Sequence, residues 1–119
     1  MPALSRVNAR HLLALSTLWL AASPVAAQLD TAQFKRFRLE ANAFNRKEIS
    51  ANAYRAGRHN GYLAGVLETL RGRGRVCFDD CMCEIDKMVD QHLADHPEPD
   101  DRPVTDWLVP LMEERFPCQ

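Results

Sequence analysis

The sequence has little that points to strands, catalysis or a membrane span. No stretch alternates apolar and polar residues over a useful length, so an extended sheet is not predicted. No glycine-rich phosphate loop, nucleophile elbow or haem-attachment motif is present. Beyond residue 27 there is no second long apolar run. We therefore expect no enzyme activity, no cofactor, no bound metal and no membrane segment in the processed chain.

The N-terminus has the three parts of a secretory signal. Arg6 and Arg10 precede an apolar run over residues 12–22, and small residues at 23–27 offer a signal-peptidase site. The run is shorter than the roughly 20 apolar residues that a membrane-spanning helix needs. We predict a cleavable signal peptide over residues 1–27, a single mature domain over residues 28–119, and a location in the periplasm.

The charge is unevenly distributed along the chain. Residues 28–76 contain ten Lys/Arg and four Asp/Glu, whereas residues 77–119 contain three Lys/Arg and twelve Asp/Glu. The acidic second half argues against nucleic-acid binding, which requires a basic surface. The opposite charges of the halves favour attraction across the fold or across a dimer interface, and a surface that steers a partner is the alternative.

Helical periodicity dominates the mature chain. The spacing of apolar residues predicts helices over residues 31–45, 48–70 and 80–96, and a fourth from residue 103 onward. Pro110 predicts a kink or a late start in the last helix because proline lacks a backbone N–H. The sequence predicts an all-α fold, a small bundle of about four helices.

Three glycines recur at every fourth position of the second predicted helix. Gly57, Gly61 and Gly65 would lie on one side of that helix. Each costs about 1 kcal/mol of helix propensity relative to alanine. We expect them to form a smooth groove that another helix approaches closely.

Four cysteines lie in the mature chain, and in an exported small domain an even number indicates disulfides. Three pairings are possible, and the sequence does not choose among them. A bond between Cys77 and Cys118 would clamp the third helix to the end of the fourth. Cys81 and Cys83 could then pair with each other, stay reduced or bridge two subunits. Alternatively, Cys81 or Cys83 forms a disulfide with Cys118.

The same cysteines could also form a metal-binding or catalytic site. With His92 or His96 they could ligate a metal, but their C-x3-C-x-C spacing differs from the usual C-x2-C pairs. A Cys–His nucleophile has no supporting motif around it. Disulfide formation is the favoured interpretation.

Several short motifs resemble those of the Rap/Tai family of type VI secretion amidase immunity proteins. They are Gly61-Tyr62-Leu63-Ala64-Gly65-Val66, Val76-Cys77, Leu93-Ala94-Asp95-His96-Pro97 and the terminal Phe116-Pro117-Cys118. The resemblance spans about residues 52–118. It implies a small all-helical periplasmic protein, often a homodimer. It also implies a non-enzymatic inhibitor that blocks the active site of a peptidoglycan amidase effector.

The chain departs from the family pattern in its cysteines. The family cysteine just before the Gly-Tyr pair and an earlier one are missing, while Cys81 and Cys83 are additional. The resemblance makes Cys77 and Cys118 the natural pair and leaves the pairing of Cys81 and Cys83 open.

The family motif residues themselves have a structural interpretation, in which Gly61 and Gly65 allow close packing and the Phe116-Pro117 end anchors the last helix. We expect effector contacts in the stiff acidic loop over residues 97–103. Such a loop inserts into a cleft at little ordering cost. The candidate contacts are Glu98, Asp100, Asp101 and Arg102.

A second hypothesis is a periplasmic acid-stress chaperone resembling the HdeA family. Such proteins are also small, exported, helical and disulfide-bonded. The acidic second half fits a protein that exposes apolar surface when its carboxylates are neutralised.

Overall fold

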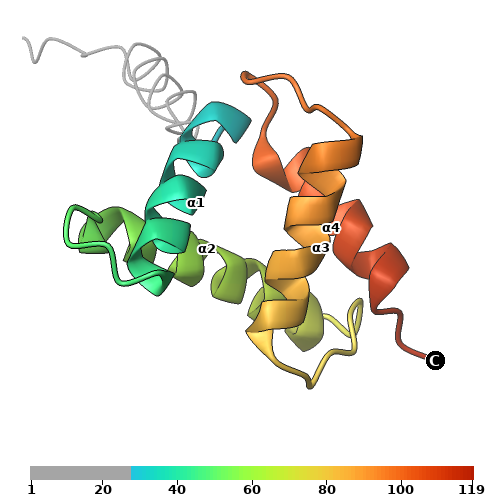
Figure 1. Cartoon of the computed structure of the whole chain (residues 1–119). Coiled ribbons are helices and arrows are strands. Elements are labelled where there is room, and N and C mark those ends of the chain that lie inside the picture. The colour runs from blue at the N-terminus through green and yellow to red at the C-terminus, as the bar shows by residue number, and fades with distance from the viewer. Residues whose placement is uncertain (1–27) are drawn as a thin grey trace, which may run out of the picture.

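The computed structural model describes residues 28–119, so the predicted signal peptide lies outside the described residues. Four helices follow one another: α1 (Thr31–Asn45), α2 (Ala53–Gly72), α3 (Met82–Asp95) and α4 (Val104–Arg115) (Figure 1). The described part contains no strand beyond one isolated bridge. The predicted all-α fold with four helices is confirmed.

The start of α2 differs from the prediction by five residues. The helix begins at Ala53, where the Asn52 side chain accepts a hydrogen bond from the Arg55 N–H at 3.0 Å. The backbone N–H of Asn52 donates to Glu40 of α1 at 2.8 Å. The predicted start near Glu48 is wrong because a cap fixed by the neighbouring helix decides the boundary.

The last helix begins at Val104 and continues through Pro110 to Arg115. The start predicted near residue 103 is confirmed, and the late start that Pro110 offered as an alternative to a kink does not occur. Proline at this position costs one intrahelical hydrogen bond. The burial of Trp107, Leu108 and Met112 on either side of it offsets that loss.

The core lies where the helices meet. On α1, Phe34 packs edge-on against Trp107 of α4 at a ring separation of 5.6 Å. The aromatic side chains of α1 are not all buried, because Phe44 is 52% exposed and Phe37 is half-buried. The buried apolar cluster contains Phe34, Leu63, Leu67, Leu70, Val76, Phe78, Ile85, Met88, Val89, Val104, Trp107, Leu108 and Met112.

A buried arginine takes the place of an apolar residue on the inner face of α1. The Arg38 side chain is only 6% exposed, and its Nε donates to Asp90 Oδ1 at 2.8 Å. Its Nη2 donates to the Asp86 backbone carbonyl at 2.8 Å, and its Nη1 lies 3.1 Å from His59 Nε2. A buried charge is tolerated only when it is paired and hydrogen-bonded. This network ties α1 to both α2 and α3.

The contact with Arg38 fixes the tautomer of His59 and favours its neutral form. A guanidinium can only donate, so His59 Nε2 accepts and the proton resides on Nδ1, 3.2 Å from Asn60 Oδ1. Burial lowers the pKa of His59, the hydrogen bond to Asn60 raises it, and the Arg38 charge lowers it. Two nearby aspartates oppose the shift, but the net direction is down. His59 is therefore held neutral in the fold.

The chain end is fastened to the segment after α2. Cys77 and Cys118, 41 residues apart in sequence, form a disulfide, and the Cys77 N–H donates to the Phe116 carbonyl at 2.9 Å. The Phe78 and Phe116 rings pack at 4.7 Å. In the chain-entropy model, a loop of this length stabilises the fold by roughly 4 kcal/mol.

We predict that His59 makes the fold less stable in mild acid. Because its folded pKa lies below 6.5, the unfolded chain takes up a proton first as the pH falls, and stability is lost between 6.5 and the folded pKa. The loss is about 1.4 kcal/mol per pKa unit between the two states. Urea unfolding of the wild type and of His59→Gln, from pH 8 to pH 5, measures this difference.

Glutamine keeps an acceptor for Arg38 but does not titrate, so His59→Gln should show a flatter pH profile. The control is His96→Gln, which removes an exposed histidine. Equal pH dependence in all three proteins would contradict the role assigned to His59.

Candidate functional site

The loop between α3 and α4 is fastened to the first turn of α1 (Figure 1). The Thr31 N–H donates to the Arg102 carbonyl and the Ala32 N–H to the Asp100 carbonyl, both at 3.0 Å. The Thr31 hydroxyl also donates to the Arg102 carbonyl at 2.7 Å and accepts from Trp107 Nε1 at 3.1 Å. These bonds satisfy N–H groups that a helix start leaves without partners. The loop is thereby held in one conformation.

Glu98 anchors the loop from the inside. Its side chain is 9% exposed, and its two oxygens lie 2.9 Å from His92 Nε2 and 2.6 Å from Arg102 Nη1. Burial raises the pKa of Glu98, but the hydrogen bonds from His92 and Arg102 and their charges outweigh that and lower it. The His92 ring stacks on Trp107 at 5.2 Å. The Glu98 carboxylate thus points into the protein.

The two aspartates of the loop point outward. The Asp100 carboxylate is 75% exposed and lies 3.3 Å from Lys35 Nζ of α1. Asp101 is exposed at the tip of the loop, and Arg102 is exposed beside it. An exposed ion pair such as Lys35–Asp100 contributes little to stability. Among the predicted contact residues, Asp100, Asp101 and Arg102 are thus presented to solvent, and Glu98 is not.

A hollow of about 570 Å³ lies beside the loop. It is lined by both basic and acidic side chains around the indole of Trp107: His92, His96, Glu98, Arg102, Glu114 and Arg115. The motif residue His96 lies at this hollow, and Pro97 begins the loop. The mixed charges suit hydrogen bonds to a polar chain segment better than they suit a small apolar ligand.

The glycine face of α2 is open. A Cβ added at Gly57, Gly61 or Gly65 would meet no heavy atom within 4 Å. The expected close approach of another helix does not occur within residues 28–119. Gly61 and Gly65 instead border a groove of about 500 Å³, and Gly57 borders a second groove of about 530 Å³ that also includes Gly61.

The floor of this groove is built from the family motif on α2. Gly61, Tyr62, Gly65 and Val66 all line it, with Val109 of α4 on its other side. The Tyr62 ring packs against Phe34 at 6.1 Å, and burial raises the pKa of Tyr62. The groove is apolar with no side chain on its glycines, which suits a helix from another chain.

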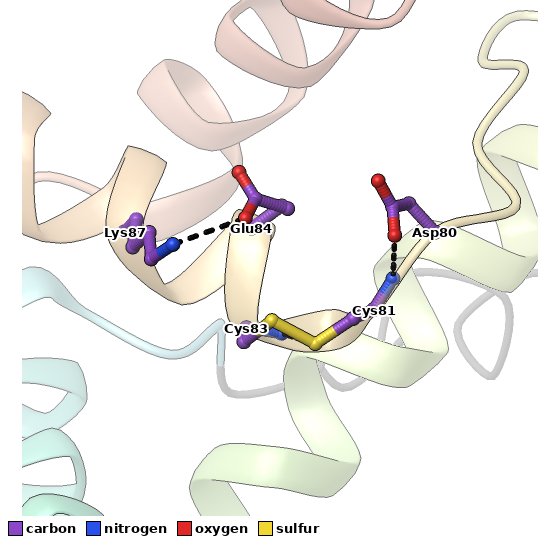
Figure 2. Close-up of a disulfide and its surroundings, with 5 residues drawn as sticks. All are labelled: Asp80, Cys81, Cys83, Glu84 and Lys87. Atoms are coloured by element: carbon purple, nitrogen blue, oxygen red, sulfur yellow. Dashed lines mark hydrogen bonds and ion pairs between the residues drawn. A yellow bond between two sulfur atoms is a disulfide. The ribbon is translucent and has the colours of Figure 1, made fainter.

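The two remaining cysteines pair with each other. Cys81 and Cys83 form a disulfide at the start of α3, on the surface of the molecule (Figure 2). The Cys81 N–H donates to Asp80 Oδ1 at 2.7 Å, and the Cys83 N–H donates to Cys81 Sγ at 3.1 Å. This resolves the pairing that the sequence left open.

Within residues 28–119 no group of three or more His, Cys, Asp or Glu side chains is placed to hold a metal ion. All four cysteines are in disulfides, so none has a thiolate to offer. No helix of the same region is both long and apolar enough to cross a membrane.

Sequence reasoning missed the buried pair of Arg38 and His59. The signal was present, because Arg38 lies four residues after Phe34 and three before Ala41, on the same helix face. The sequence likewise does not predict the hydrogen bond between His92 and Glu98, because the expectation for Glu98 was an outward contact. The bond between the two side chains depends on how the loop folds back.

Residues 25–118 match the family model described as Rap1a immunity proteins. Comparisons with curated proteins and with solved structures give no match.

We predict that the Glu98 carboxylate keeps the loop ordered. Glu98→Ala leaves His92 and Arg102 without their shared acceptor and should destabilise the fold by about 1–3 kcal/mol. Hydrogen exchange of the Thr31 and Ala32 amides, which donate to the loop, should become faster.

Asp101→Ala, at the exposed tip of the same loop, is the control and should leave both the stability and the exchange rates unchanged. Unaltered exchange in Glu98→Ala would show that the loop is held without this carboxylate.

Proposed function

The chain belongs to the Rap1a immunity protein family, and on that premise we propose that it is a periplasmic inhibitor of a type VI secretion peptidoglycan amidase effector. The observation that carries the proposal is the family match over residues 25–118, which covers every described residue except Gln119. An immunity protein acts by binding and not by catalysis. The family match favours this function over that of an acid-stress chaperone. The specific support for a chaperone is the acidic second half of the chain.

We propose that the loop over residues 97–103 enters the active-site cleft of the effector. Two features support this. Main-chain hydrogen bonds to Thr31 and Ala32 hold the loop in place, so little ordering entropy is lost on binding. Asp100 and Asp101 present carboxylates to solvent at its tip, which suits a cleft lined by basic residues or by a metal ion.

The first experiment is to express the chain in the periplasm of its own host and identify what is captured with it at neutral pH. A stoichiometric peptidoglycan hydrolase would support the proposal. A pure preparation without a companion, from cells that express their secretion effectors, would contradict it.

We predict that Asp100→Ala combined with Asp101→Ala weakens inhibition of the captured effector by about tenfold or more, because two carboxylates at the centre of the interface are lost. Inhibition of peptidoglycan hydrolysis by purified variants measures the effect. Thermal unfolding should be nearly unchanged, since only the exposed Lys35 ion pair is lost.

The matched control is Asp79→Ala combined with Asp80→Ala. It removes the same charge at the opposite end of α3 and should inhibit as the wild type does. Equal inhibition by both double variants would exclude the loop as the contact.

We also propose that the chain forms a homodimer through the glycine groove of α2. The open, apolar floor formed by Gly61 and Gly65 supports this, because backbones can approach closely there. The groove carries Arg73 and Arg75 at one end, and the second half of the chain is acidic, so two copies offer complementary charge.

We predict that Gly61→Leu abolishes the dimer without destabilising the monomer, because the added Cβ meets no heavy atom of its own chain and the rest of the side chain occupies the open groove. Gly61→Ala should even stabilise the isolated helix by about 1 kcal/mol. Light scattering after size-exclusion chromatography measures the mass, and thermal unfolding measures the stability.

Glu68→Leu, at an exposed position of α2 outside the groove, is the control and should remain dimeric. A Gly61→Leu protein with the same mass as the wild type would exclude this groove as the interface.

A further inference from the structure

We propose that the Cys81–Cys83 disulfide is a thiol-oxidising site, which accepts two electrons from a pair of cysteine thiols in another protein. Both cysteines are exposed at the start of α3 (Figure 2). The bond is therefore accessible to an attacking thiolate. This inference is independent of effector binding and of the α2 groove.

The bond has little structural use. It joins residues only two apart in sequence, whereas Cys77–Cys118 joins residues 41 apart. A disulfide stabilises a fold mainly by restricting the unfolded chain, and the restriction grows with the length of the closed loop. Opening Cys81–Cys83 thus leaves the fold held by its core and by the long-range disulfide. The protein therefore remains folded when Cys81 and Cys83 are reduced.

The position of the disulfide at the start of α3 determines which of its two sulfurs is the better leaving group. Cys81 is the cap residue of α3, and its sulfur already accepts the Cys83 N–H at 3.1 Å. A thiolate on Cys81 would gain from that N–H and from the positive end of the helix dipole. Cys81 is therefore the better leaving group, and the attacking sulfur bonds to Cys83.

The partner is oxidised in two successive thiol–disulfide exchange steps. A partner thiolate attacks Cys83 Sγ, a mixed disulfide forms, and Cys81 leaves as a thiolate and takes up a proton. The partner's second thiolate attacks the partner sulfur of the mixed disulfide and displaces Cys83, which is protonated in turn. The partner loses two protons and two electrons and gains a disulfide, and the site ends as a dithiol. No further oxidant enters this single turnover.

The surroundings select the partner by charge. Asp79, Asp80 and Glu84 lie within three residues of the disulfide, and Lys87 is paired with Glu84 at 3.1 Å. Figure 2 shows the Asp80 and Glu84 carboxylates beside the bond, the first on the Cys81 N–H and the second on Lys87. The local excess of negative charge disfavours acidic partners and attracts a cysteine pair flanked by Lys or Arg.

The test mixes the oxidised mature chain with two reduced dithiol peptides that differ only in flanking lysines or glutamates. We expect one peptide disulfide per chain, formed about tenfold faster with the lysine peptide at low salt. Acid quenching, alkylation and mass spectrometry should find thiols only at Cys81 and Cys83. With reduced glutathione, the first mixed disulfide should be found at Cys83.

The control is the double variant Cys81→Ser with Cys83→Ser, which keeps Cys77–Cys118. It should oxidise neither peptide and should unfold at nearly the wild-type temperature. Reduced peptides after incubation with the wild type, or prior opening of Cys77–Cys118, would overturn the proposal. Glutathione bound first at Cys81 would overturn the assigned direction of attack.

Discussion

The guanidinium of Arg38 is the group whose position most constrains the helices. Helix α1 contributes two buried apolar residues, Phe34 and Ala41, so packing alone specifies its position weakly. A buried positive charge must instead find all its partners at once. Those partners lie on α2 and α3, and any sliding of α1 would leave a desolvated donor without an acceptor. Hydrogen-bond geometry thus fixes the position of α1 relative to α2 and α3, which the packing of a larger apolar core would otherwise do.

The long-range disulfide and the α3–α4 loop complete the arrangement from the two ends of α4. Cys77–Cys118 holds the end of the chain against the segment after α2. At the other end, the carbonyls of Asp100 and Arg102 accept N–H groups from the start of α1. Helix α1 is therefore joined by main-chain bonds to the loop that precedes α4, and to α4 itself by contact of Phe34 with Trp107.

Much of this architecture could be read from the sequence, because helical periodicity needs only local information. The bounds of α1 were predicted as they are, whereas α2 was placed too early, since its cap depends on Glu40 of another helix. The burial of Arg38 could not be predicted in this way, because helical periodicity identifies a buried face by its apolar residues. The glycine spacing indicates where the groove on α2 lies, but the helix expected to approach it closely is not found within residues 28–119. Likewise, cysteine spacing did not decide whether Cys81 and Cys83 pair with each other.

The loop beside α1 is fixed by backbone carbonyls and by the buried Glu98 carboxylate. The groups that fix its conformation are therefore different from the side chains that it exposes to solvent. The side chains at positions 100 and 101 take no essential part in its conformation. They can be exchanged over generations without endangering the fold. On the proposed role of the loop, a lineage that meets a new effector can thus change the residues that contact it while the rest of the fold stays the same.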